Sequence, residues 1–300
     1  MHIITKQEIE KMAADPRAMI READEAYNRQ LEKIAEAIYV KRFETPLILI
    51  SGPSGSGKTT TALKLEKLLD GMGCETHTLS MDNYFQSIDA EGKKLMEAGL
   101  LDLESPARMD IPFLNDQLAA IIDGRDVELP RYDFPTSTRM GSGVMLRRKP
   151  DELVILEGIH ALNPEVIRHG DDRSTRIYVS VRTRMDWGGG LLHPSYIRLM
   201  RRMLRDVLRG RDHNGTCAMF DSVERGEENY IMPYKYRSQF DIDTFFAYEP
   251  CVYRALLGDA IASLKDPRFA DVLIPAISDL PTIDPSLIPR DALIREFIGG

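Results

Sequence analysis

A glycine-rich stretch, Gly52-Pro53-Ser54-Gly55-Ser56-Gly57-Lys58-Thr59, holds the residues with the clearest chemistry in this 300-residue chain. Four apolar residues before it predict a strand over 47–50, and residues 60–69 after it have helical character. Strand, G-x-x-x-x-G-K-[ST] loop and helix together form the P-loop pattern, whose backbone N–H groups converge on phosphate oxygens. The sequence therefore predicts a nucleoside triphosphate site, with ligand contacts from Gly52, Ser54, Gly55, Ser56, Gly57, Lys58, Thr59 and Thr60.

Two side chains of this pattern predict a magnesium nucleotide. Lys58 would reach the β- and γ-phosphates, and the Thr59 hydroxyl would ligate Mg²⁺. A second metal ligand is expected at Glu157, which directly follows the apolar stretch 153–156. A strand that ends in a carboxylate has the form of a Walker B strand, which holds Mg²⁺ directly or through water.

Asp82 follows a second predicted strand, over residues 76–80. In doubly wound α/β sheets, ligands bind beyond the carboxyl ends of the strands, so Asp82 falls where a substrate belongs. Transfer of a phosphoryl group to a hydroxyl needs a carboxylate that orients the hydroxyl and accepts its proton. From position alone, a second interpretation stays open, in which Asp82 only caps the next turn.

Arginines are concentrated on a predicted helix over 195–208 and just beyond it: Arg198, Arg201, Arg202, Arg205, Arg209 and Arg211. A basic helix face is commonly solvated or bound to nucleic acid. Because a triphosphate is already implied, we expect instead a mobile lid that neutralises charge during γ-phosphoryl transfer. Only some of these arginines can face the phosphates, and Arg202 and Arg205 share one face.

Composition narrows the class of protein. The formal net charge of −8 argues against a general nucleic-acid binder. Cys74, Cys217 and Cys251 are far apart and form no metal-binding spacing, which is typical of reduced thiols. The first residues contain no apolar signal segment, and no apolar run reaches transmembrane length. We therefore expect a soluble, cytoplasmic protein.

The expected organisation is a kinase-like core over 45–265 between an N-terminal helical extension (1–44) and a C-terminal tail (266–300). The apolar stripe of the helix over 5–42 either packs on the core or binds a partner. Within the core we expect a helix over 111–122, a hairpin over about 127–147 and a lid at about 195–216. Further elements are strands 175–181 and 240–246 and helices 249–264 and 292–298. Residues 86–110 are expected to form a loop. Residues 212–230 are polar, and no helix or strand is predicted for them.

These motifs, in this order, resemble the uridine kinase / phosphoribulokinase family of P-loop kinases, closest to bacterial uridine kinase-like nucleoside kinases. The resemblance covers roughly residues 45–265, through the P-loop and Ser80–Phe85. It also includes Val127–Phe134 with Arg139, Val154–Pro164 and Arg201–Arg211. It implies a three-layer α/β/α fold with a parallel sheet of about five strands, an appended β-hairpin and an arginine-rich helical lid.

The resemblance also implies an activity and roles for single residues. The family phosphorylates a nucleoside 5′-hydroxyl with ATP or GTP, which makes Asp82 the expected base. Catalytic or phosphate contacts are implied for Lys58, Arg202, Arg205 and Arg211, and acceptor contacts for Asp82, Tyr84, Glu104, Tyr132, Ser137, Arg139 and Arg202. Family members are often homo-oligomers, so at least a dimer is expected.

Three departures from the family pattern bear on the acceptor. Ser137 stands where uridine-cytidine kinases have a histidine that reads the pyrimidine, and Glu104 stands where they have an aspartate that holds the ribose. The lid turn is also one residue shorter. Loss of a base-reading donor weakens discrimination, so a sugar, sugar phosphate or polyol remains an alternative acceptor. Alternatives of another class are a non-catalytic nucleotide-binding regulator and an NTPase that acts on nucleic acid.

Overall fold

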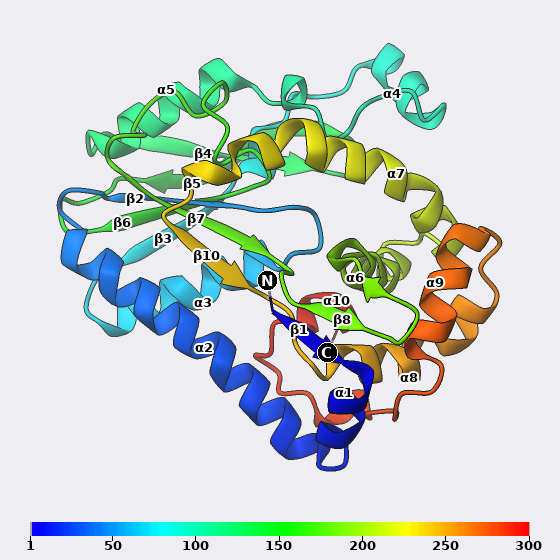
Figure 1. Cartoon of the computed structure of the whole chain (residues 1–300). Helices are drawn as coiled ribbons and strands as arrows, with labels where there is room; N and C mark the ends of the chain where they lie inside the picture. Colours follow the sequence, from blue (N-terminus) through cyan, green and yellow to red (C-terminus); the bar gives the residue numbers. More distant parts are fainter. Residues whose placement is uncertain (1, 300) are drawn as a thin grey trace.

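The computed structural model describes residues 2–299 and is built on a five-stranded parallel sheet with the strand order β10-β7-β2-β6-β3 (Figure 1). The central strand β2 feeds directly into the glycine-rich loop. The strands are β2 (Leu47–Ser51), β3 (Thr76–Ser80), β6 (Leu153–Glu157), β7 (Ser174–Ser180) and β10 (Phe240–Asp243). The predicted α/β fold with a parallel five-stranded sheet is confirmed.

Strand β2 shows why the sheet has helices on both faces. All five of its residues are buried, and alternate side chains enter different cores. Ile48 and Ile50 pack into one hydrophobic cluster, whereas Leu47 and Leu49 pack into the other. This is the pattern of a strand that is covered on both sides, because successive side chains point to opposite faces.

The first cluster lies between the sheet and α2 (Pro16–Lys41), α3 (Lys58–Gly71) and the C-terminal helices. Helix α2 buries the predicted apolar stripe, including Tyr27, Leu31 and Ile34, against this core. The stripe therefore serves packing rather than an outside partner. The predicted single helix over 5–42 is divided, because Asp15 caps α2 and Pro16 begins it after α1 (Lys6–Met12).

The second cluster is covered by α5 (Ile111–Ile122) and a two-stranded hairpin, β4 (Val127–Asp133) with β5 (Thr138–Leu146). The predicted hairpin is confirmed, although its second strand begins six residues before the predicted Val144. Between β3 and α5 the chain forms the 3₁₀ turn η1 (Met81–Tyr84), the short helix α4 (Ala90–Glu97) and a second 3₁₀ turn, η2 (Pro106–Arg108). Helix α4 was not predicted.

The arginine-rich helix α6 (Pro194–Leu208) is followed by α7 (His213–Tyr230), where the sequence had indicated only polar chain. Helices α8 (Glu249–Ala262), α9 (Pro267–Ile277) and α10 (Arg295–Ile298) complete the C-terminal part beside α6 (Figure 1). A small sheet of β1 (Ile3–Thr5), β8 (Arg184–Asp186) and β9 (Leu191–Leu192) was also not predicted. None of the helices within residues 2–299 has the length and apolar character to cross a membrane.

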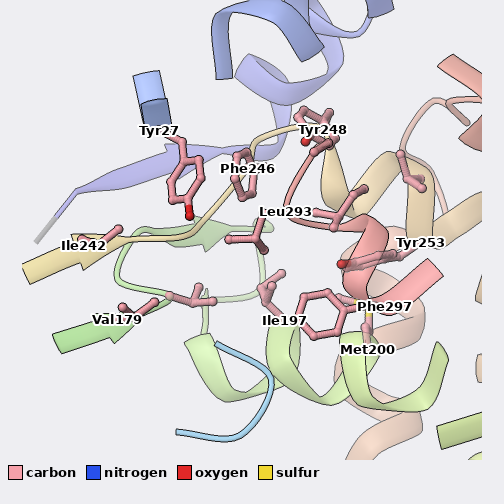
Figure 2. Close-up of a cluster of buried hydrophobic side chains, with 14 of the residues drawn as sticks. Tyr27, Val179, Ile197, Met200, Ile242, Phe246, Tyr248, Tyr253, Leu293 and Phe297 are labelled. Atoms are coloured by element: carbon pink, nitrogen blue, oxygen red, sulfur yellow. The ribbon is translucent and has the colours of Figure 1, made fainter. Parts of the chain in front are cut away.

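Figure 2 shows how the C-terminal segment enters the first cluster. Leu293 and Phe297 lie beside Ile197 and Met200 of α6, and all four side chains are almost fully buried. Full burial of such side chains contributes about 1.5–3 kcal/mol each. The end of the chain is therefore packed against the helix that carries the arginines.

Candidate active site

The glycine-rich loop lies at the carboxyl end of β2 and leads into α3. Gly55 and Gly57 have φ angles of +78° and +86°, in the left-handed region that favours glycine. A Cβ atom at Gly52 would lie 1.9 Å from the carbonyl oxygen of Val179. Gly57 precedes α3 and offers no side-chain cap to the N–H groups of the first helical turn. This backbone suits phosphate oxygens.

A cavity of about 350 Å³ opens beside this loop. Its walls come from the loop, the turn after β3, the segment before α5, the hairpin, the end of β6 and the end of α6. The predicted site residues that line it are Ser54, Gly55, Gly57, Lys58, Thr59, Asp82, Glu104, Tyr132, Ser137, Glu157 and Arg205. One cavity thus joins the phosphate loop to residues predicted for the acceptor.

Lys58 lies near the carboxylates of this cavity. Its Nζ donates a hydrogen bond to the carbonyl oxygen of Pro53 over 3.2 Å, which leaves further N–H donors on the ammonium group. Burial lowers the pKa of Lys58, and the charges of Glu157 and Asp82 oppose that shift. Burial also raises the pKa of Glu157, which lines the cavity together with Thr59. A cation bound here would relieve the cost of the buried carboxylates.

Asp82 lies in η1, directly after β3. The cap of this turn is Ser80, whose hydroxyl accepts the N–H of Asp82 over 3.4 Å. Within residues 2–299 the Asp82 carboxylate accepts no hydrogen bond, so the capping alternative is not what the structure shows. The protein around it raises its pKa by desolvation, against the positive charges of Lys58, Arg209 and Arg205.

Glu104 enters the cavity from the segment between α4 and α5. Its Cβ lies 2.3 Å from the position that a Cβ on Gly226 of α7 would take, so only glycine fits at that turn of the helix. Burial raises the pKa of Glu104, and the charges of Arg202 and Lys58 oppose the shift. Helix α7 thus holds the Glu104 segment over the cavity.

The far end of the cavity is aromatic. The ring of Tyr132 meets Phe85 and Phe134 edge to face, with ring centroids 5.7 Å and 5.2 Å apart. Arg108 donates from Nη2 to the Tyr132 hydroxyl over 3.3 Å, and its guanidinium lies 5.1 Å from the centre of the Phe85 ring. Ser137 borders this end with a φ of +56°, the only non-glycine with positive φ in the described chain.

The arginines of α6 divide into distinct environments. Arg201 is fully buried and donates to the carbonyl oxygen of Gly55 over 3.0 Å. Arg198 donates to the carbonyl oxygen of Ser54 and pairs with Glu227 of α7. These two side chains support the glycine-rich loop from behind and do not line the cavity.

Arg202 and Arg205 lie three residues apart on α6, Arg202 against the glycine-rich loop and Arg205 at the cavity. Arg202 donates to the Ser54 hydroxyl over 2.6 Å, while its buried Nε has no partner within residues 2–299. Burial and the neighbouring charge of Arg205 lower the pKa of Arg202 to about 10. Arg205 lines the cavity and contacts Asp206 over 3.2 Å.

Seven predicted residues do not line the cavity: Gly52, Ser56, Thr60, Tyr84, Arg139, Arg202 and Arg211. The Tyr84 hydroxyl donates to Gln117 over 3.0 Å in the second core. Arg139 pairs with Asp110 over 2.7 Å, and Arg211 pairs with Asp206 over 3.2 Å. Gly52 and Ser56 are buried in the loop behind the lining residues. Thr60 is engaged by the C-terminal segment.

Sequence reasoning missed several lining residues, among them Phe85, Arg108, Phe134 and Glu296. Phe85 and Phe134 are the last residues of two of the family motifs, and Arg108 lies four residues after Glu104. Closeness in sequence to residues predicted for the acceptor could therefore have indicated all three. Glu296 offered no such signal, because it reaches the loop from 236 residues away in the sequence.

The sequence profile of the Phosphoribulokinase / Uridine kinase family matches residues 47–245. The chain belongs to this family. It is 32% identical over 193 residues to a uridine kinase of Staphylococcus aureus (strain JH9), which covers 64% of this chain and 84% of that protein. It is 28% identical over 188 residues to a uridine kinase of Halobacterium salinarum, which covers 62% of this chain and 74% of that protein.

Among solved structures, the YGR205w protein aligns with 76% of this chain and 95% of its own length, at a TM-score of 0.52 and 17% sequence identity. That likeness concerns the fold. Family membership makes the chain a nucleotide-binding P-loop kinase, a phosphotransferase with an alcohol group as acceptor. The alternative of a non-catalytic regulator is therefore disfavoured.

Proposed function

We propose that this kinase transfers the γ-phosphoryl group of ATP or GTP to a primary hydroxyl of a nucleoside similar to uridine or cytidine. The observation that carries the proposal is one cavity that is lined by Lys58 and Asp82 and also by the aromatic side chains of Phe85, Tyr132 and Phe134. Aromatic side chains offer stacking and edge contacts to the planar ring of a nucleobase.

In this proposal, the residues divide between donor and acceptor. The glycine-rich loop and Lys58 bind the β- and γ-phosphates, and Arg202 and Arg205 neutralise charge on the transferred group. The unpartnered Nε of Arg202 and the remaining N–H donors of Lys58 fit an anion at this place. The Thr59 hydroxyl and the Glu157 carboxylate would hold Mg²⁺, which would offset the negative charge of the donor phosphates.

The chemical step follows from the position of Asp82. Its carboxylate orients the acceptor hydroxyl and takes the proton as the hydroxyl oxygen bonds to the γ-phosphorus. The bond from that phosphorus to the oxygen that bridges to the β-phosphate breaks, and the nucleoside diphosphate leaves with the electron pair. Glu104 would accept from hydroxyls of the acceptor sugar, at one methylene more than an aspartate reaches.

A second acceptor class, a sugar phosphate, is favoured by one observation. Arg108 places a positive charge at the acceptor end, where Ser137 replaces a base-reading histidine. An anionic group on the acceptor would pair with this guanidinium.

An ADP-release assay with matched acceptors tests the proposal. Uridine and cytidine would be compared with the other nucleosides, with free sugars and polyols, and with pentose and hexose phosphates. Stimulation by pyrimidine nucleosides supports the nucleoside proposal, and stimulation by sugar phosphates alone overturns it. The variant Arg108→Gln separates the two acceptors, because it should weaken only the use of an anionic one.

A further inference from the structure

The C-terminal segment, residues 285–299, ends against the first turn of the P-loop helix. Glu296 accepts two hydrogen bonds from Thr60, one from the backbone N–H over 3.3 Å and one from the hydroxyl over 2.7 Å. Leu293 makes a second contact: its Cδ1 lies 2.7 Å from the position that a Cβ on Gly57 would take. The segment therefore contacts the same loop that binds the donor phosphates.

Two apolar side chains and an arginine hold this segment in place. Leu293 and Phe297 are fully buried beside α6, as Figure 2 shows. The guanidinium of Arg201 lies 5.2 Å from the centre of the Phe297 ring. Arg295 donates to the carbonyl oxygens of Pro285 and Gly299, each over 3.1 Å, which closes the segment on itself. The backbone around Glu296 is thus firmly placed.

The groups that Glu296 occupies are phosphate ligands in this kind of site. Thr60 is the third residue of α3, so its N–H is one of those without a partner inside the helix. In a P-loop, backbone N–H groups of this turn cradle the donor phosphates, and the helix end favours negative charge. A carboxylate bound there takes the place of a phosphate oxygen and adds a negative charge to the donor side.

We infer that Glu296 is an internal competitor of the donor nucleotide, and that its carboxylate must leave Thr60 before the phosphates can bind in full. This inference rests on the proposed function, because it concerns the donor site of the same kinase. Leu293 and Phe297 keep the segment packed, so the movement is a rotation of the half-buried Glu296 side chain. After it rotates, the negative charge stays close to the donor.

Such a contact lowers the apparent affinity for the donor. Only molecules with Glu296 turned away are competent to bind, so the apparent dissociation constant rises in inverse proportion to their fraction. Repulsion between the displaced carboxylate and the phosphates acts in the same direction. A signal or partner that holds the carboxylate off Thr60 would activate the enzyme without touching the acceptor site.

Calorimetric titration with MgATP and MgADP, without acceptor, tests the inference. The variants are Glu296→Gln and Glu296→Ala, and the matched control is Asp291→Asn, which removes a negative charge from an exposed position of the same segment. We expect both Glu296 variants to bind about tenfold tighter, with the control equal to wild type. Unchanged or weaker binding in both variants overturns the inference, and weaker binding would make Glu296 a donor-holding residue.

A structure of the wild-type protein with MgADP gives a second, independent readout. The inference requires the Thr60 N–H to donate to a phosphate oxygen while Glu296 has turned away, and an intact contact between Glu296 and Thr60 overturns it. Because neither measurement uses an acceptor, a failed acceptor screen contradicts the proposed function alone. Nucleotide binding that is equally tight in the wild type and in the Glu296 variants contradicts the inference alone.

Discussion

Arg201 on α6 and Glu249 on α8 form an ion pair in which both side chains are fully buried. Nε of Arg201 donates to one carboxylate oxygen over 3.1 Å, and Nη1 donates to the Gly55 carbonyl oxygen over 3.0 Å. Burial tends to raise the pKa of Glu249, and the charge of Arg201 opposes it. One arginine thus connects α6, the phosphate loop and the C-terminal helices.

Arg201→Met should reduce the free energy of unfolding by about 3–5 kcal/mol, because it leaves the Glu249 charge buried without its partner. Urea denaturation measures the change. The double variant Arg201→Met with Glu249→Leu should recover a large part of the loss, since no buried charge remains. A double variant as unstable as the single one would show that the loss comes from packing.

Asp82→Asn should lower kcat by about 10²–10⁴, because the amide cannot take the proton of the acceptor hydroxyl. Donor binding and the free energy of unfolding should stay close to those of the wild type, because Asp82 is exposed and its carboxylate accepts no hydrogen bond within residues 2–299.

Steady-state kinetics, nucleotide titration and thermal unfolding check these three outcomes for Asp82→Asn. The matched control is Asp126→Asn, an exposed aspartate before the hairpin that lies outside the cavity. Near-normal kcat in Asp82→Asn would remove Asp82 from the role of base. A melting temperature well below that of the wild type would show that the loss of activity comes from a folding defect rather than from the missing base.

Local patterns were enough to predict the sheet, because its central strands β2 and β6 are short apolar runs that lead into residues with chemistry. The P-loop, Asp82 and Glu157 follow β2, β3 and β6 directly, and parallel strands bring their carboxyl ends together. For that reason most of the predicted residues line one cavity. The prediction depended on the spacing of apolar residues and on which residues follow each strand, and both can be read from the local sequence.

What the sequence did not predict depends on distant contacts. Helix α7 carries a narrow buried stripe, Thr216, Cys217, Phe220 and Val223, within a polar and glycine-containing stretch. The role of this helix becomes clear only from the structure, in which Gly226 packs against Glu104. The contact of Glu296 with Thr60 and the pairing of Arg139 with Asp110 likewise join segments whose local patterns say nothing of each other.

Ser137 stands where uridine-cytidine kinases have a histidine. Variants at this position test whether its side chain contacts the acceptor or whether only its backbone conformation matters. Its left-handed φ of +56° should make Ser137→Val cost about 1–2 kcal/mol of stability, whereas Ser137→Gly should cost nothing. If the serine hydroxyl contacts the acceptor, both variants raise the acceptor KM and leave the donor KM unchanged. An unchanged acceptor KM in the folded Ser137→Gly variant would exclude that contact.

His160 should make the protein sensitive to acid. Its ring is buried, both nitrogens lack a hydrogen-bond partner within residues 2–299, and burial lowers its pKa to about 4. Between pH 6.5 and 4 the unfolded chain binds a proton that the folded chain excludes, so stability falls as the pH falls, by roughly 3 kcal/mol in total. Urea denaturation across this range should show a shallower loss in His160→Gln. His169→Gln, at an exposed histidine, should keep the wild-type slope, and equal slopes in all three proteins would show that His160 does not titrate on unfolding.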